Sequence, residues 1–132
     1  MEILLDTHTF LWYMAGDSRL SINAKSYIDN RENIRYLSAA SLWEIAIKYS
    51  TGRLILIEPY ETLMPRLLQI NGINVLNLSI EHLSEVANLP FPDSTHRDPF
   101  DRLIIAQSRV EDLPVLSIDA KFDAYGIQRL WC

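Results

Sequence analysis

The sequence is poor in cysteine, glycine and basic residues. Its single cysteine, Cys132, excludes a disulfide within the chain and a cysteine cluster for structural zinc, which is typical of a cytoplasmic protein. There are 17 Asp and Glu residues against 12 Lys and Arg residues, so the formal net charge of -5 excludes a global positive field that would attract nucleic acid. No apolar run reaches the roughly 18 residues that span a bilayer, and no signal peptide is recognisable. We therefore expect a soluble, unprocessed, cytoplasmic protein.

Short apolar segments alternate with helix-type segments along the 132 residues, without low-complexity linkers or internal repeats. This alternation predicts a single α/β domain over residues 1–132, and the nearly continuous hydrophobicity of the strand candidates favours a parallel sheet covered on both faces. Strands are expected at residues 2–6, 35–38, 74–78, 115–119 and 127–131, and helices at 7–15, 22–31, 40–50, 60–70, 80–87 and 99–111. Pro65 lies inside the fourth helix and is expected to kink or break it.

Four acidic residues are expected near the carboxyl ends of the strands, where ligands bind in an open parallel sheet. They are Asp6 in "ILLDTH", Glu44 in "SAASLWEIAIKYSTGRL", Asp101 in "RDPFDRLIIAQ" and Asp119 in "VLSID". An ionised carboxylate that directly follows a buried strand, as Asp6 does, is costly unless a hydrogen-bond donor or a cation accompanies it.

Each acid also has a purely structural explanation. Asp6 and Asp119 can cap the helices that follow them. Ser41 and Glu44 have the spacing of a capping box, and Glu44 can form an ion pair with Lys48 one helical turn later. These explanations stand beside the functional one for every single residue.

The segment "DPFD" is typical of a helix start, with Asp98 as N-cap, Pro99 at the first helical position and Asp101 at the third. Helix caps need no charge, however, whereas four carboxylates at one edge of a sheet repel one another. A divalent cation would relieve this repulsion, and oxygen ligands suit Mg²⁺ in particular. The four acids together therefore predict a site for one or two metal ions of the kind used in phosphodiester hydrolysis.

These segments resemble the PIN domain, in particular the VapC-like toxins of bacterial and archaeal toxin–antitoxin pairs. The resemblance is carried by "LLDTHTFLW", "LSAASLWEIAIKYSTGRL", "HRDPFDRLIIAQS" and "VLSIDAKFDAYG", in the order of the family and over nearly the whole chain. It implies a three-layer α/β/α sandwich with a central, mostly parallel sheet. It also implies an endoribonuclease that depends on Mg²⁺ or Mn²⁺, a cognate antitoxin and a homodimer, with DNA reached only through the antitoxin and no role for a membrane.

The resemblance further implies the roles of individual residues. Asp6, Glu44, Asp101 and Asp119 match the catalytic, metal-holding acidic quartet, with Asp98 as an auxiliary acid and Thr7 and Ser117 as supporting hydroxyls. Lys48, Arg53, Arg97 and Arg102 are candidates for contact with the RNA backbone, and each is also explained as a solvated surface charge. His8 stands where many relatives have Asn and is expected to have no ligand role.

Other residues favour plainer interpretations. His82 and His96 are expected to be surface histidines, because no second His or Cys stands at zinc-ligand spacing. Leu11, Trp12 and Met14 form an apolar helix face that is expected to pack in the core. An exposed part of this face, or of "YETLMPRLLQI", would suit a protein partner.

Alternative functions remain open at this point. One is a housekeeping PIN nuclease for RNA processing without an antitoxin. Another, of a different class, is a receiver-like or phosphatase-like module with a phosphorylated strand-end aspartate, although "DTHT" lacks the second acid of a phosphatase D-x-D motif. A catalytically inactive binding module is the last.

Overall fold

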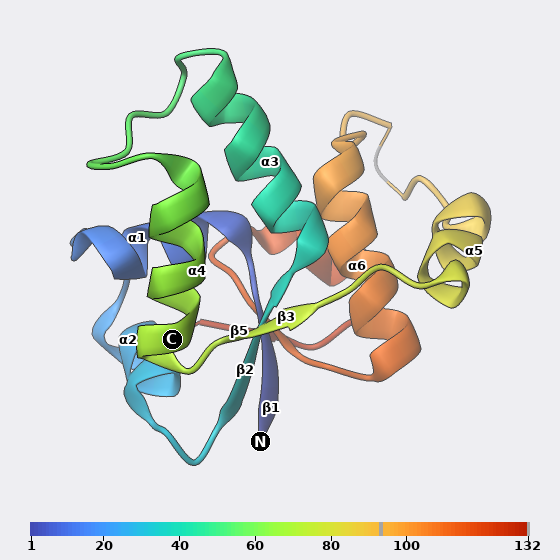
Figure 1. Cartoon of the computed structure of the whole chain (residues 1–132). Helices are drawn as coiled ribbons and strands as arrows, with labels where there is room; N and C mark the ends of the chain where they lie inside the picture. Colours follow the sequence, from blue (N-terminus) through green and yellow to red (C-terminus); the bar gives the residue numbers. More distant parts are fainter. Residues whose placement is uncertain (93, 132) are drawn as a thin grey trace.

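Five parallel strands form the centre of the molecule, in the order β3-β2-β1-β4-β5 (Figure 1). The computed structural model describes residues 1–92 and 94–131. The strands are β1 (Glu2–Leu5), β2 (Ile34–Ser38), β3 (Asn74–Leu76), β4 (Val115–Leu116) and β5 (Arg129–Leu130). Each neighbouring pair is parallel. The residues Ile3, Leu4 and Leu5 of the middle strand are fully buried, because helices cover both faces of the sheet.

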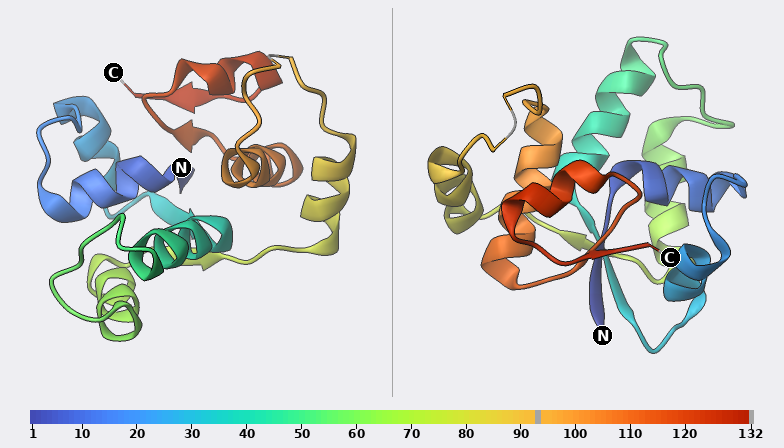
Figure 2. Two further views of the ribbon diagram at one scale, coloured as in Figure 1. Left: turned by 90° about the horizontal axis from the view of Figure 1, so that it is seen from above. Right: turned by 180° about the vertical axis from the view of Figure 1, so that it is seen from behind.

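The helices lie on both sides of the sheet. They are α1 (Thr7–Ala15), α2 (Ile22–Asp29), α3 (Ala39–Ser50), α4 (Tyr60–Asn71), α5 (Ile80–Asn88), α6 (Pro99–Glu111) and the 3₁₀-helix η1 (Ala120–Tyr125). Figure 1 shows α1, α2 and α4 on one side of the sheet, α5 and α6 on the other, and α3 extending beyond the carboxyl ends of the strands. The view from behind in Figure 2 places η1 beside α6. The predicted three-layer α/β/α sandwich is confirmed.

Alternate residues of β1 enter two separate apolar cores. Leu5 belongs to the first core together with Phe10 of α1 and Ile28 of α2. Leu4 belongs to the second core together with Ile104 of α6. Because successive side chains of a strand point to opposite faces, this single strand holds the two helical layers together.

The element boundaries agree closely with those expected from the sequence. The limits of α1 and α6 are those predicted. Strands β1, β3, β4 and β5 are shorter than expected, whereas β2 begins one residue earlier than expected, at Ile34. Helix α4 continues through Pro65, so the predicted break is wrong. A proline removes only one intrahelical hydrogen bond, and the neighbouring Leu63 and Met64 are anchored in the first core. Among the described residues, no helix is both long enough and apolar enough to cross a membrane.

Candidate metal centre

The candidate site lies where the order of the strands changes direction. From β1 the chain proceeds outward to β2 and β3 on one side, and it later returns to add β4 and β5 on the other side. The carboxyl ends of β1 and β4 therefore form the switch point of the sheet, the usual ligand position in open parallel folds. Asp6 directly follows β1, and Asp119 follows β4 by three residues.

Asp6 is buried at this point, with 4% of its surface exposed. It occupies the N-cap position of α1, as predicted, and its carbonyl accepts the Phe10 N–H at 3.0 Å. Its side chain, however, makes no capping bond. The carboxylate instead accepts a hydrogen bond of 2.8 Å from the Ser117 hydroxyl. Burial raises the pKa of Asp6, and the Ser117 bond opposes that rise, so the ionised form is held at a cost.

Both predicted hydroxyl residues lie at this edge. The Ser117 hydroxyl contacts Asp6 and also accepts the Asp119 N–H at 3.0 Å, and in this way it joins the ends of β1 and β4. The Thr7 hydroxyl donates to the Ser41 hydroxyl at 2.8 Å and connects the first turns of α1 and α3. Both hydroxyls thus hold the backbone around the acids, while only Ser117 contacts one of them through its side chain.

Glu44 lies on the inner side of α3, with 7% of its surface exposed. Its carboxylate pairs with Lys48 at 2.9 Å, as the spacing predicts. The capping box of Ser41 and Glu44 is wrong, because α3 begins at Ala39 and is capped by the Ser38 hydroxyl, which accepts the Ala40 N–H. Lys48 therefore forms an ion pair with a site acid, and this ion pair competes with any contact between Lys48 and RNA.

Helix α6 begins as its sequence predicts. The Asp98 carboxylate accepts the N–H groups of Phe100 and Asp101 at 2.8 and 3.1 Å, with Pro99 at the first helical position. Asp101 is thus at the third helical position and faces the sheet edge. Burial raises the pKa of Asp101 to about 7, the His96 hydrogen bond opposes this rise, and the negative charges of Asp98 and Asp6 add to it.

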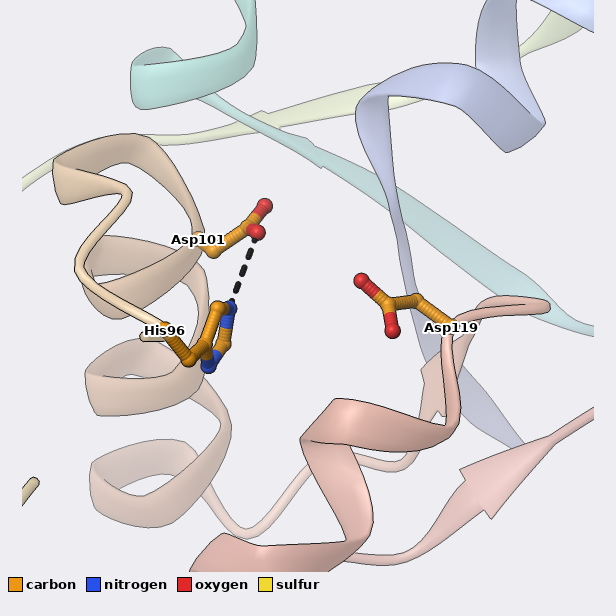
Figure 3. Close-up of side chains that lie close together, drawn as sticks. All are labelled: His96, Asp101 and Asp119. Atoms are coloured by element: carbon orange, nitrogen blue, oxygen red, sulfur yellow. Dashed lines mark hydrogen bonds and ion pairs between the residues drawn. The ribbon is translucent and has the colours of Figure 1, made fainter. Parts of the chain in front are cut away.

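His96 is a component of the site that sequence reasoning placed wrongly. The expectation of a surface histidine is wrong, because only 4% of the residue is exposed. Its Nε2 lies 3.1 Å from Oδ2 of Asp101, as Figure 3 shows. Candidate ligand atoms of His96, Asp101 and Asp119 all lie within 4.8 Å of one another. The sequence carries no signal for this, because His96 lies in an irregular segment before α6, where neither helical nor strand periodicity reports burial.

His82 is also buried, contrary to expectation, but for a local reason. Its backbone N–H donates to the Ser79 hydroxyl, and its ring Nδ1 accepts the Ser79 N–H at 3.0 Å, which closes a capping box at the start of α5. Its Nε2 lies 3.8 Å from Glu111 at the far end of α6 from Asp101. His82 is therefore structural and does not belong to the site.

Asp119 closes the site from the side of β4. Its carboxylate accepts the Lys121 N–H at 3.0 Å and caps η1, as predicted. The side chain nevertheless points across the gap toward Asp101 and His96 (Figure 3). The capping bond therefore uses only part of the hydrogen-bonding and metal-binding capacity of this carboxylate.

The donor set fits a hard divalent cation. In the described part of the chain, no lysine or arginine forms an ion pair with Asp6, Asp101 or Asp119. The charge of Asp6 acts on Asp101, and that of Glu44 acts on Asp6, so the acids are close enough to repel one another. Carboxylate oxygens are the ligands that Mg²⁺ and Mn²⁺ prefer, and a bound cation would relieve this repulsion.

The predicted basic residues lie in different environments. The Arg102 guanidinium is buried, donates to the carbonyls of Leu89 and Pro90, and lies 3.7 Å from the centre of the Phe91 ring. The expectation of a solvated surface charge is therefore wrong for Arg102, because its guanidinium donors hold the loop before α6. Arg53 and Arg97 are exposed, as expected.

An apolar groove opens beside the acids. It has a volume of about 680 Å³, and it runs between α1, the connection from α3 to α4, and α4. Its lining includes His8 and Lys48, the neighbours of the site, and apolar residues that include Leu11, Trp12, Met14, Ile55, Ile57, Leu63 and Leu67. The faces of α1 and α4 that were considered for a partner are thus partly buried and partly open to this groove.

Comparison with known proteins agrees with this fold. The sequence matches the PIN domain family over residues 3–128. No curated protein matches it significantly.

Several solved structures share the fold. A chain of VapBC2 from Rickettsia felis, bound to a DNA fragment from its promoter, has a TM-score of 0.74 at 14% identity and covers 100% of both chains. DNA-bound VapBC from Salmonella typhimurium gives 0.72 at 17% identity, covering 100% of this chain and 99% of that one. FitAcB from Neisseria gonorrhoeae gives 0.68 at 22% identity, covering 97% and 96%. Because the family match spans nearly the whole sequence, the chain belongs to the PIN domain family.

Proposed function

We propose that the chain is a divalent-metal-dependent endoribonuclease and the toxin of a VapBC-type toxin–antitoxin pair. The nuclease proposal is supported chiefly by the carboxylates of Asp6, Asp101 and Asp119 at the switch point. Asp6 is buried, the other two are half-buried, and none of the three pairs with a lysine or arginine among the described residues. Such a site attracts a cation before it can attract a phosphate, and metal-assisted hydrolysis requires no nucleophilic side chain. Membership of the PIN domain family, whose members are nucleases, supports the same conclusion.

In this proposal Asp6, Glu44, Asp101 and Asp119 hold one or two Mg²⁺ or Mn²⁺ ions, and Asp98 assists through water. A cation bound there would supply an activated water as nucleophile and positive charge for the scissile phosphate. Ser117 fixes the orientation of Asp6 through its hydrogen bond, and a carboxylate oxygen left free accepts the proton of the attacking water.

Substrate binding falls to the cation and to local positive charge, because the chain as a whole is acidic. Arg53 and Arg97 are exposed and available for contact with the RNA backbone. Lys48 can join them only if substrate or metal releases it from Glu44. Phosphate contacts of this kind position a strand without reading its sequence.

The apolar groove supports the antitoxin part of the proposal. Its apolar lining reaches the acidic edge, so it suits a partner segment that combines apolar side chains with a basic one. Several structures of similar fold are complexes of VapB with VapC, some bound to DNA. We propose the same kind of cytoplasmic assembly here, with a homodimeric toxin and DNA bound only through the antitoxin.

Metal-dependent cleavage tests the nuclease proposal. The purified chain, free of partners, should cleave structured RNAs with Mg²⁺ or Mn²⁺ and lose activity in EDTA. Asp6→Asn and Asp101→Asn should each lower the rate by at least about 100-fold, because each removes a charged oxygen ligand. Glu32→Gln is the control, since Glu32 is exposed and lies before β2 at the opposite edge of the sheet. Cleavage that survives EDTA, or equal rates in all variants, would contradict the proposal.

A further inference from the structure

His96 occupies a buried position between η1 and the first turn of α6. Its ring lies 5.6 Å from the Tyr125 ring and 6.2 Å from the Phe122 ring, measured between centroids. Its Nδ1 lies 3.0 Å from the Tyr125 hydroxyl, and its Nε2 lies 3.1 Å from Oδ2 of Asp101. Both ring nitrogens are therefore engaged, and three side chains form one continuous chain of hydrogen bonds.

The chemistry of Asp101 and Tyr125 determines which group donates in each of these two hydrogen bonds. An ionised Asp101 carboxylate only accepts hydrogen bonds, so Nε2 of His96 must carry the hydrogen. In a neutral ring Nδ1 is then an acceptor, and the Tyr125 hydroxyl is the group that donates to it. The reverse arrangement would point the lone pair of Nε2 at a negative oxygen. Tyr125 is buried and so holds the ring in one tautomer away from water.

We propose that His96 is a positioning residue that orients the Asp101 carboxylate for metal binding, with Tyr125 setting its tautomer. Oδ2 is occupied by His96, and Oδ1 is the oxygen left to bind the cation. Figure 3 shows the second oxygen of Asp101 turned away from the imidazole ring. Asp101 thus binds the cation through one oxygen. This inference rests on the proposed metal site and assigns a role to a residue outside the acidic quartet.

Direct coordination by His96 is the competing role, because its ligand atom lies within 4.8 Å of those of Asp101 and Asp119. The hydrogen bonds argue against it. A cation at Nε2 requires that nitrogen to lose its hydrogen, which removes the bond to Asp101 and gives Nδ1 a hydrogen in front of the Tyr125 hydroxyl. Positioning keeps every partner in place, as do the groups that hydrogen-bond to the ligands of other metal sites and orient them.

Metal affinity tests the positioning role by calorimetric titration with Mn²⁺ and Mg²⁺. His96→Ala should weaken the binding of both ions by about 10-fold to 100-fold, as expected for the loss of a group that orients a ligand. His96→Gln should recover much of this loss, because its side-chain amide can still donate to Asp101. Tyr125→Phe should give a smaller loss of the same kind. His82→Gln is the matched control, a buried histidine whose partners lie away from the acids.

The outcomes separate this inference from the function on which it rests. A wild-type chain that binds neither ion overturns the metal site itself. Wild-type affinity in His96→Ala, with metal bound, overturns only the positioning role.

Spectroscopy of the wild-type chain tests the same role without relying on the folding of a variant. Nitrogen NMR of the metal-free protein at pH 8, where the Asp101 carboxyl is ionised, should show His96 as the Nε2–H tautomer, and an Nδ1–H tautomer at that pH would overturn the inference. Pulsed EPR of the Mn²⁺-loaded protein should show no coupling between the ion and a ring nitrogen of His96. A nitrogen coupling that disappears in His96→Gln would make His96 a direct ligand and would overturn the proposal.

Discussion

Asp101 is affected both by burial and by the negative charges of the neighbouring acids. Its pKa of about 7 lies well above the ordinary value of 3.8, chiefly because the carboxyl is buried, and also because Asp98 and Asp6 lie nearby. The hydrogen bond from His96 offsets only part of this shift. Ionising such a carboxyl without a cation costs free energy. The metal-free protein is therefore destabilised at pH values at which the site is fully ionised.

This cost predicts the pH dependence of stability. Between about pH 4 and pH 7 the folded state binds more protons at Asp101 than the unfolded state, so the free energy of unfolding of metal-free protein falls as the pH rises through this window. Above pH 7 this contribution is constant. Asp101→Asn should remove it and be more stable than the wild type at pH 8 in EDTA. Urea unfolding of both proteins from pH 5 to pH 8 measures the difference.

Mg²⁺ supplies the corresponding control. Added to the wild type, it should restore stability more at pH 8 than at pH 5, because protons compete with the cation for the same oxygens. Parallel stability curves for the wild type and Asp101→Asn in EDTA would show that burial of this carboxyl costs the folded state nothing.

At the scale of the element, the first turn of α6 combines a helix cap with the candidate site. The Asp98 carboxylate accepts two backbone N–H groups, including that of Asp101, and so fixes the helical turn from which Asp101 projects. The capping role alone accounts for the presence of Asp98. Its charge lies close enough to Asp101 to raise the pKa of that residue, which connects the cap to the electrostatics of the site.

Two substitutions separate these roles of Asp98. Asp98→Ala should lower the free energy of unfolding by about 1 kcal/mol, because two N–H groups lose their acceptor. Asp98→Asn keeps the capping oxygen and should cost only a few tenths of that amount. Thermal or urea unfolding in EDTA measures both, and an equal loss in the two variants would mean that the charge stabilises the fold and the capping bonds do not.

At the scale of the whole molecule, the acidic edge and the apolar groove open next to each other. His8 and Lys48 line the groove, while their neighbours Asp6 and Glu44 belong to the edge. Ile55 and Ile57, which are each 91% exposed, also line the groove. Isoleucines left in water beside a functional edge are typical of a surface that a partner covers. One partner segment could therefore fill the groove and reach the acids.

Expression in cells tests this arrangement. If the chain is the proposed toxin, its expression should arrest growth, and co-expression of its cognate antitoxin should relieve the arrest. Ile57→Asp should still cleave RNA and arrest growth, but its binding to that antitoxin should weaken by more than about tenfold, because a charge replaces an apolar contact in the groove. Glu32→Gln should be neutralised like the wild type. Active enzyme whose expression leaves growth unaffected would favour a housekeeping nuclease over a toxin.

Local sequence patterns were sufficient for the elements and for part of the site. The start of α6 follows from its cap, because Asp98 caps the helix where the order Asp-Pro predicts it. The location of Asp6 and Asp119 after buried strands follows from the same kind of reasoning. These properties depend on neighbours within a few residues, so a single sequence reports them directly.

Only the tertiary structure decided how the groups combine. Asp6 meets Ser117 because β1 and β4 are adjacent strands, although the two residues are far apart in the chain. His96 and Arg102 are buried because they satisfy partners that η1 and the loop before α6 bring to them. The sequence by itself therefore determined the approximate positions of the strands and α-helices and of the acids that follow the strands, whereas η1 was not among the expected helices. Burial and hydrogen-bond partners of polar side chains were decided by strand order and packing, since these bring together residues that no local periodicity connects.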